Sequence, residues 1–279
     1  MVPRSSPSRF TSRRGCRLAV AAFAALLLTG AGPARSEEYA FYSLTVHDGL
    51  SQSHVTSIAQ DSLGFLWFGT TNGLNRWDGH EFTVYRHVPV DASSRGSPVI
   101  RDRQVESDGT LWISTEPGSD SLAPGSADVT RYAHDPEDDS SLPSGVFGNV
   151  ISDGNGAVWS TVERLNESTG HSERLIVRLD ATTGQARRFT LGSEPDIRPL
   201  SIHADREGGI WLGTGFEFGS PRSGRAGLYR FDAAEEVFEW VDLGPPATGG
   251  VGAIAEDSRG HLWVAGNGGE VAEFSPHTG

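Results

Sequence analysis

Residues 61–70 read DSLGFLWFGT, and the pattern of this phrase recurs four more times along the chain. Each copy has an acidic residue, a glycine three positions later and a tryptophan three positions after the glycine. Successive tryptophans are separated by 45, 47, 52 and 52 residues. A fixed unit at this spacing indicates a repeat architecture rather than an ordinary globular domain. The five pairs are Gly64 and Trp67, Gly109 and Trp112, Gly156 and Trp159, Gly208 and Trp211, and Gly260 and Trp263.

Each unit is predicted to form four short strands. In the first unit we expect them at residues 55–59, 66–70, 73–78 and 82–85. Short alternating runs separated by glycine-marked turns are typical of all-β folds. One tryptophan per four-stranded unit indicates a propeller blade. The sequence therefore predicts an all-β fold, a β-propeller with about five four-stranded blades.

The repeated residues are interpreted as structural. An aromatic at the same place in every unit is expected in the core between neighbouring blades, where stacking buries the apolar faces. This is favoured over a carbohydrate-stacking platform. The repeated acids are Asp61, Glu106, Asp153, Asp205 and Asp257. We expect them to hold the turn between the first and second strands through backbone hydrogen bonds, and we assign no catalytic residue.

Composition excludes several kinds of chemistry. The formal charge is −13, all 23 basic residues are arginine, and the only cysteine is Cys16. Without lysine the chain cannot be a Schiff-base enzyme, a P-loop NTPase or a protein kinase. One cysteine cannot build a cysteine-rich metal site, and the acidic charge disfavours nucleic acid as a partner. No histidine–carboxylate metal motif is present, so we expect neither a metal nor a cofactor.

The first 36 residues resemble a secretory signal peptide. Five arginines in residues 1–17 precede an unbroken apolar run at residues 18–28, and Ala34-Arg35-Ser36 fits a cleavage site. The apolar run is shorter than a membrane span. Cleavage would remove six arginines and no acid, which takes the formal charge from −13 to −19. We therefore expect a periplasmic protein whose propeller repeats occupy residues 37–279.

Loop lengths single out one end of the blades. The span from the repeat tryptophan to the aromatic that closes the fourth strand grows from 18 residues in unit one to 30 in unit three and 29 in unit four. The extra residues are expected in loops at about 163–174 and 215–226, and loops on a rigid scaffold commonly carry recognition. The alternative is a tolerated surface insertion. The candidate ligand-binding residues are Glu163, Arg164, Phe216, Phe218 and Arg222.

Four stretches of the chain match the pattern of one known family: residues 44–51 (LTVHDGLS), 61–70, 73–79 (GLNRWDG) and 132–136 (YAHDP). On these stretches the chain resembles the two-component regulator propellers, the sensor regions of bacterial hybrid two-component systems. The resemblance covers about residues 41–279. Unit two departs from the pattern in its third strand, and unit five has EVAEF at residues 270–274 in place of Gly-Leu-x-Arg-Phe.

The resemblance implies a periplasmic domain that senses a carbohydrate or similar small molecule. It also implies a seven-bladed ring, so this chain would be an N-terminal fragment, with residues 41–46 as a fourth strand that completes the last blade. The partners implied are an oligosaccharide or small-molecule ligand, the remaining blades, and downstream modules such as a histidine kinase in a phosphorelay. Contact with the membrane would come only through that downstream part. The alternatives are a propeller enzyme of sialidase or lyase type, and a secreted interaction scaffold or decayed gene product.

Overall fold

The computed structural model describes residues 41–86, 99–106, 109–116, 118–124, 129–165, 172–191, 197–216, 224–244 and 250–276. The chain divides into two units, Met1–Ser43 and Leu44–Gly279, and every strand belongs to the second. The predicted signal peptide lies outside the described residues. No helix in the described part is long and apolar enough to cross a membrane.

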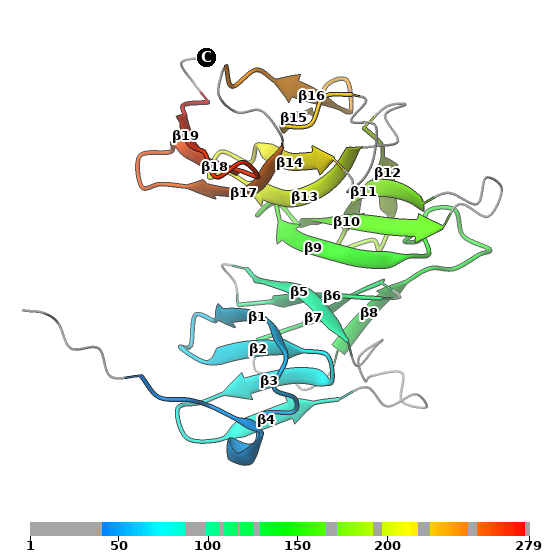
Figure 1. Ribbon diagram of the computed structural model, residues 1–279. Coiled ribbons are helices and arrows are strands. Elements are labelled where there is room, and N and C mark those ends of the chain that lie inside the picture. Colours follow the sequence, from blue (N-terminus) through cyan, green and yellow to red (C-terminus); the bar gives the residue numbers. More distant parts are fainter. Residues whose placement is uncertain are drawn as a thin grey trace, which may run out of the picture. The chain divides into compact units, whose positions relative to one another are not determined.

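Five antiparallel sheets follow one another in chain order (Figure 1). Sheet 1 holds β1 (Val55–Gln60), β2 (Leu66–Thr70), β3 (Gly73–Trp77) and β4 (Phe82–Tyr85). Sheet 2 holds β5 (Ile100–Val105), β6 (Leu111–Thr115), β7 (Gly118–Leu122) and β8 (Val129–Ala133). Sheet 3 holds β9 (Val146–Ser152), β10 (Ala157–Leu165), β11 (Ser172–Asp180) and β12 (Ala186–Phe189). Sheet 4 holds β13 (Ile197–Ala204), β14 (Ile210–Phe216), β15 (Leu228–Asp232) and β16 (Val237–Val241), and sheet 5 holds β17 (Val251–Glu256), β18 (Leu262–Gly266) and β19 (Val271–Phe274).

The prediction of an all-β propeller is confirmed. Within each sheet the strands pair in sequence order, and the first strands of successive sheets (β1, β5, β9, β13 and β17) contact one another. Hydrogen bonds join these strands across the sheet boundaries. The Thr56 hydroxyl on β1 donates to the Ile100 carbonyl on β5 at 3.0 Å, and the Val150 N–H on β9 donates to Asp102 on β5 at 3.1 Å. This arrangement of the first strands is that of propeller blades around an axis.

The core lies between the sheets, as expected for the repeat tryptophans. Trp67 packs with residues of sheet 2, Trp112 with sheet 3, Trp159 with sheet 4 and Trp211 with sheet 5. These four side chains are no more than 6% exposed, whereas Trp263 is 40% exposed. Trp263 differs because no described sheet packs on that side of sheet 5.

The turn between the first and second strands needs its glycine. Gly64, Gly109, Gly156, Gly208 and Gly260 all have φ between 83° and 90°. This is a left-handed conformation that residues with a Cβ adopt at a cost. The same conformation at all five positions explains why the phrase is repeated in the sequence.

The predicted strand at residues 41–46 stays a prediction, because its partner would be a last blade that is not among the described residues. Without that partner, residues 44–45 are in no strand, and Val46–Asp48 form a 3-10 helix that Thr45 caps. An extended segment needs a ladder partner to become a strand, and the capping bonds from Thr45 and Asp48 favour the helical turn instead. The predicted loop at 163–174 is shorter, because β10 continues to Leu165 and β11 begins at Ser172. In sheet 4, likewise, Gly215 and Phe216 belong to β14.

Candidate ligand-binding site

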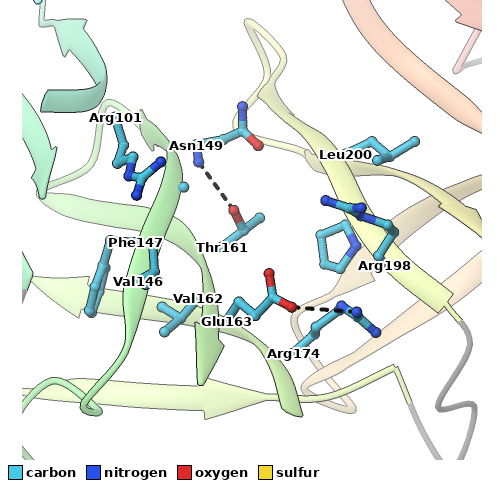
Figure 2. Close-up of a pocket in the computed structure, with 12 residues that line it drawn as sticks. Arg101, Val146, Phe147, Asn149, Thr161, Val162, Glu163, Arg174, Arg198 and Leu200 are labelled. Atoms are coloured by element: carbon cyan, nitrogen blue, oxygen red, sulfur yellow. Dashed lines mark hydrogen bonds and ion pairs between the residues drawn. The ribbon is translucent and has the colours of Figure 1, made fainter. Parts of the chain in front are cut away.

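A cavity of about 300 Å³ opens at one end of sheets 2, 3 and 4 (Figure 2). Its lining comes from the starts of the first strands β5, β9 and β13, and from the hairpin ends of β10 and β11. This is the end of the blades at which the enlarged loops were predicted. We call this feature the arginine cavity; its lining residues are Arg101, Val146, Phe147, Gly148, Asn149, Thr161, Val162, Glu163, Arg174, Arg198, Pro199 and Leu200.

A β-bulge in every sheet shapes this end of the molecule. All five pairings of first and second strands shift register near the start of the first strand. In sheet 2 the extra residue is Arg101, in sheet 4 it is Leu200, and in sheet 3 Gly148 and Asn149 together face Thr161. A bulge bends its strand and redirects a side chain. Here it brings side chains of three sheets to one cavity.

Three guanidinium groups and one carboxylate line the cavity. Arg174 donates to Glu163 at 3.5 Å, and the side chain of Arg174 is only 9% exposed while that of Glu163 is 50% exposed. Arg101 pairs at 2.7 Å with Glu116, which lies outside the lining. Arg198 is exposed on β13, and its guanidinium has no hydrogen-bond or ion-pair partner among the described residues. The lining is therefore cationic in a chain that is acidic overall.

Neutral polar groups and an apolar wall complete the site. The Thr161 hydroxyl accepts a hydrogen bond from the backbone N–H of Asn149 at 3.1 Å, which ties the bulge of β9 to β10. The Asn149 side chain remains at the cavity, as Figure 2 shows, and its amide can both donate and accept hydrogen bonds. Val146 and Leu200 add apolar surface. Convergent polar groups beside apolar walls are typical of small-molecule sites.

The sequence-predicted candidates are dispersed. Glu163 lines the arginine cavity, but Arg164 does not: it lies next along β10 and pairs with Glu173 on β11 at 2.7 Å. Phe216 ends β14, opposite Ile197, and is not part of the lining. Phe218 and Arg222 lie outside the described residues.

Sequence reasoning missed Arg101, Asn149, Arg174 and Arg198. For Arg101, the sequence does contain a signal that could have identified it. The residue at the bulge stands eleven positions before the repeat tryptophan, as Arg101 does before Trp112 and Leu200 before Trp211. Arg198 and Arg174 have no such mark, because the fold alone brings β13 and β11 to the cavity.

Four of the repeated acids, Asp61, Asp153, Asp205 and Asp257, hold their turns through backbone hydrogen bonds, as predicted. Most of the five acids also accept a hydrogen bond from the repeat tryptophan. In Asp205 one carboxylate oxygen accepts the backbone N–H groups of Glu207 and Gly209, at 3.0 and 2.7 Å. The other accepts the indole N–H of Trp211 at 2.7 Å. Asp61, Glu106 and Asp257 also accept the indole N–H of their own tryptophan. The carboxylates of these acids are thus already used in hydrogen bonds within their own units.

One grouping of potential metal ligands exists among the described residues: Asp257, His261 and Glu273. Arg259 donates to the carboxylates of Asp257 and Glu273 at 2.7 and 2.8 Å. Its guanidinium therefore supplies the positive charge at this cluster. The bond to Arg259 is also the main cause that holds the pKa of Asp257 well below its usual value. We interpret the cluster as an ion-pair network that closes the turn of sheet 5.

Comparisons with known proteins agree with this architecture. The two component regulator propeller family matches residues 49–72 and 246–268. A 61-residue stretch is 51% identical to histidine kinase P4 of Formosa agariphila; it makes up 22% of this chain and 4% of that kinase.

Two solved structures share the fold. The extracellular domain assigned to a one-component system of B. thetaiotaomicron aligns with a TM-score of 0.58 at 19% identity, over 86% of this chain and 33% of that one. An inactive histidine-to-alanine variant of virginiamycin B lyase from Staphylococcus aureus, solved with quinupristin, aligns with a TM-score of 0.56 at 17% identity, over 85% and 74% of the two chains. The present chain thus spans about a third of the extracellular domain that it resembles.

Proposed function

We propose that this chain, in which residues 49–72 and 246–268 match the two-component regulator propeller family, is the ligand-sensing part of an extracytoplasmic bacterial signalling protein. Its ligand is a saccharide or a similar small molecule, and the output comes from a module of the parent protein such as a histidine kinase. The resemblance to extracellular domains and the stretch shared with a histidine kinase support this assignment.

One observation carries the proposal: the arginine cavity is built by three sheets at once. A ligand bound there contacts β5, β9, β10, β11 and β13 together, so its binding energy acts on the boundaries between sheets 2, 3 and 4. Binding can shift an equilibrium between arrangements only if the ligand prefers one of them. A ligand that contacts three sheets at once can bind more tightly to one arrangement of those sheets than to another, which suits a sensor.

The lining also favours binding over catalysis. Glycoside hydrolysis by the common mechanisms needs two carboxyl groups beside the scissile bond. The described lining has one, Glu163, and it contains no histidine, tyrosine, cysteine or serine. The likeness to virginiamycin B lyase is one of fold.

The test is a calorimetric and thermal-shift screen of the purified chain against neutral and acidic mono- and oligosaccharides. We expect at least one saccharide to bind without being turned over. Asn149→Ala removes a cavity amide and should weaken that binding about five- to tenfold.

The matched control is Glu239→Gln. Glu239 lines a separate hollow of about 460 Å³ formed by sheet 4 alone, with Glu207 and Arg230. This variant should bind as the parent does. Absence of binding across the whole panel, or product formation from a bound saccharide, would overturn the proposal.

A further inference from the structure

We infer that the ligand of the arginine cavity carries an oxyanion, a carboxylate or a sulfate, and that Arg198 is the residue that selects for it. This inference rests on the proposed sensing function and names the class of ligand. Three observations carry it: the positive charge of the cavity lining, the lack of a described partner for the Arg198 guanidinium, and the ion pair between Arg174 and Glu163.

The charge of the cavity is opposite to that of the chain. The sequence has 36 acidic residues and 23 arginines, yet the cavity lining has three arginines and one glutamate. The three guanidinium groups come from three different sheets: Arg101 from sheet 2, Arg174 from sheet 3 and Arg198 from sheet 4. No single stretch of sequence gathers them. Cations that converge from separate elements on one hollow attract an anion there.

Arg198 is the cation available to a ligand. Arg101 already pairs with Glu116, and Arg174 already pairs with Glu163. The Arg198 guanidinium has no such partner among the described residues, and Figure 2 places its side chain at the cavity beside Leu200 and across from Glu163. A guanidinium offers five N–H donors in a planar fork that matches the two oxygens of a carboxylate or sulfate. An oxyanion would satisfy the fork directly.

Arg174 and Glu163 together determine how positive the electrostatic potential in the cavity is. The Arg174 side chain lines the cavity and is almost wholly buried, so its charge is held in place and poorly screened by solvent. Glu163 is half exposed and holds Arg174 at the long distance of 3.5 Å, so it offsets only part of that charge. Removing the Glu163 charge should therefore make the cavity a stronger anion site. If Glu163 itself contacted the ligand, removing its charge would weaken binding instead.

The cavity volume favours a small ligand. About 300 Å³ is at the lower end of the range for ligand pockets, roughly 300–1,000 Å³. Val146 and Leu200 offer apolar contact to the C–H face of a sugar ring, while Asn149 can bind hydroxyl groups. A monosaccharide or disaccharide that carries at least one acidic group fits this combination of size and chemistry.

The test uses isothermal titration calorimetry on the full chain with four probes: digalacturonic acid, galactose 6-sulfate, neutral galactobiose and inorganic sulfate. We expect one of the two acidic sugars to bind, and which of them binds decides between a carboxylate and a sulfate. Its affinity should fall at least about tenfold in Arg198→Gln, because a charge-assisted bond is lost. It should rise several-fold in Glu163→Gln, and it should weaken as NaCl is raised.

The outcomes separate this inference from the proposed function. If galactobiose binds as tightly as the acidic sugars, with binding sensitive to Asn149→Ala and indifferent to Arg198→Gln, the sensing function stands and the oxyanion inference is overturned. If inorganic sulfate binds as tightly as either sugar, the cavity is a general anion site and the saccharide part of the inference fails. If no probe binds and the wider saccharide screen is also empty, both proposals fail.

Discussion

The acid that precedes each tryptophan by six residues uses its two carboxylate oxygens differently. In units one, three, four and five, one oxygen accepts backbone N–H groups of the turn. In four of the five units, a carboxylate oxygen accepts the indole N–H. Unit three is the exception. Asp153 accepts the N–H groups of Asn155 and Ala157, but the Trp159 Nε1 is buried without a partner among the described residues. Unit three therefore serves as an internal control for how much the bond between the acid and the indole N–H contributes to stability.

Replacing Asp205 by Asn should destabilise the protein more than replacing Asp153 by Asn. In Asp205→Asn the variant loses a charged acceptor of three N–H groups, and we expect a loss of about 2–3 kcal/mol in the free energy of unfolding. In Asp153→Asn only the two backbone bonds weaken, with an expected loss of about 1 kcal/mol. Urea unfolding followed by tryptophan fluorescence measures both. Equal losses would mean that the indole bond adds nothing.

At the level of the strand, the residue two positions after the repeat tryptophan faces the next sheet in sheets 1, 2 and 4. The position is Gly69 in sheet 1, opposite Ile100, and Gly213 in sheet 4, opposite Val251. In sheet 2 it is Ser114, whose hydroxyl donates to the Gly148 carbonyl of sheet 3. Small residues at this position thus set how closely neighbouring sheets approach.

Gly213→Ala should separate sheets 4 and 5. A Cβ at Gly213 would lie 2.6 Å from the backbone oxygen of Val251, and a backbone atom in a strand cannot move aside cheaply. We expect a loss of about 1–3 kcal/mol in stability. Gly69→Ala is the matched variant: there the new Cβ would meet side-chain atoms of Ser57 and Ile100, which can shift, so its cost should be smaller. A Gly213→Ala protein with the parent's melting temperature would contradict this packing.

Prediction from sequence worked where one local pattern determines the structure. The strands β2 (Leu66–Thr70) and β4 (Phe82–Tyr85) lie where the alternation and glycines put them, and the turn glycines have the left-handed φ that the phrase requires. The strand expected at residues 41–46 stays a prediction, because its formation depends on a partner blade that is not among the described residues. Most of the arginine cavity was missed for a similar reason: bulges and the contact of sheets 2, 3 and 4 gather its side chains, and neither is written in a short motif.

Over the whole molecule, stability should depend on pH in two ranges. Burial lowers the pKa of His203 below its usual 6.5, despite the nearby carboxylates of Glu256 and Asp205. The folded state therefore favours neutral His203, and stability present above pH 6.5 is lost as the pH falls below that value. Three aspartates form the second group, and a hydrogen bond lowers the pKa of each. The donor to Asp78 is Glu81, the donor to Asp138 is Ser140, and the donor to Asp180 is Thr183. That contribution is present above about pH 3.8 and is lost below it.

Thermal melts at half-unit steps from pH 8 to pH 3 measure both ranges. We expect one decline in melting temperature between about pH 6.5 and 5, and a second one below about pH 4. His203→Gln should abolish the first decline and leave the second. A first decline that persists in this variant would assign the upper range to another group.

The sensing account is tested most directly by amide hydrogen exchange on the full chain, with and without the saccharide that binds most tightly. The account predicts slower exchange at residues 146–149, 161–163 and 198–200, which line the arginine cavity in sheets 3 and 4. It predicts no change at the turns around Gly64 and Gly260, which lie at the other end of the strands. Protection confined to those turns, or bound saccharide without protection at the cavity, would contradict it.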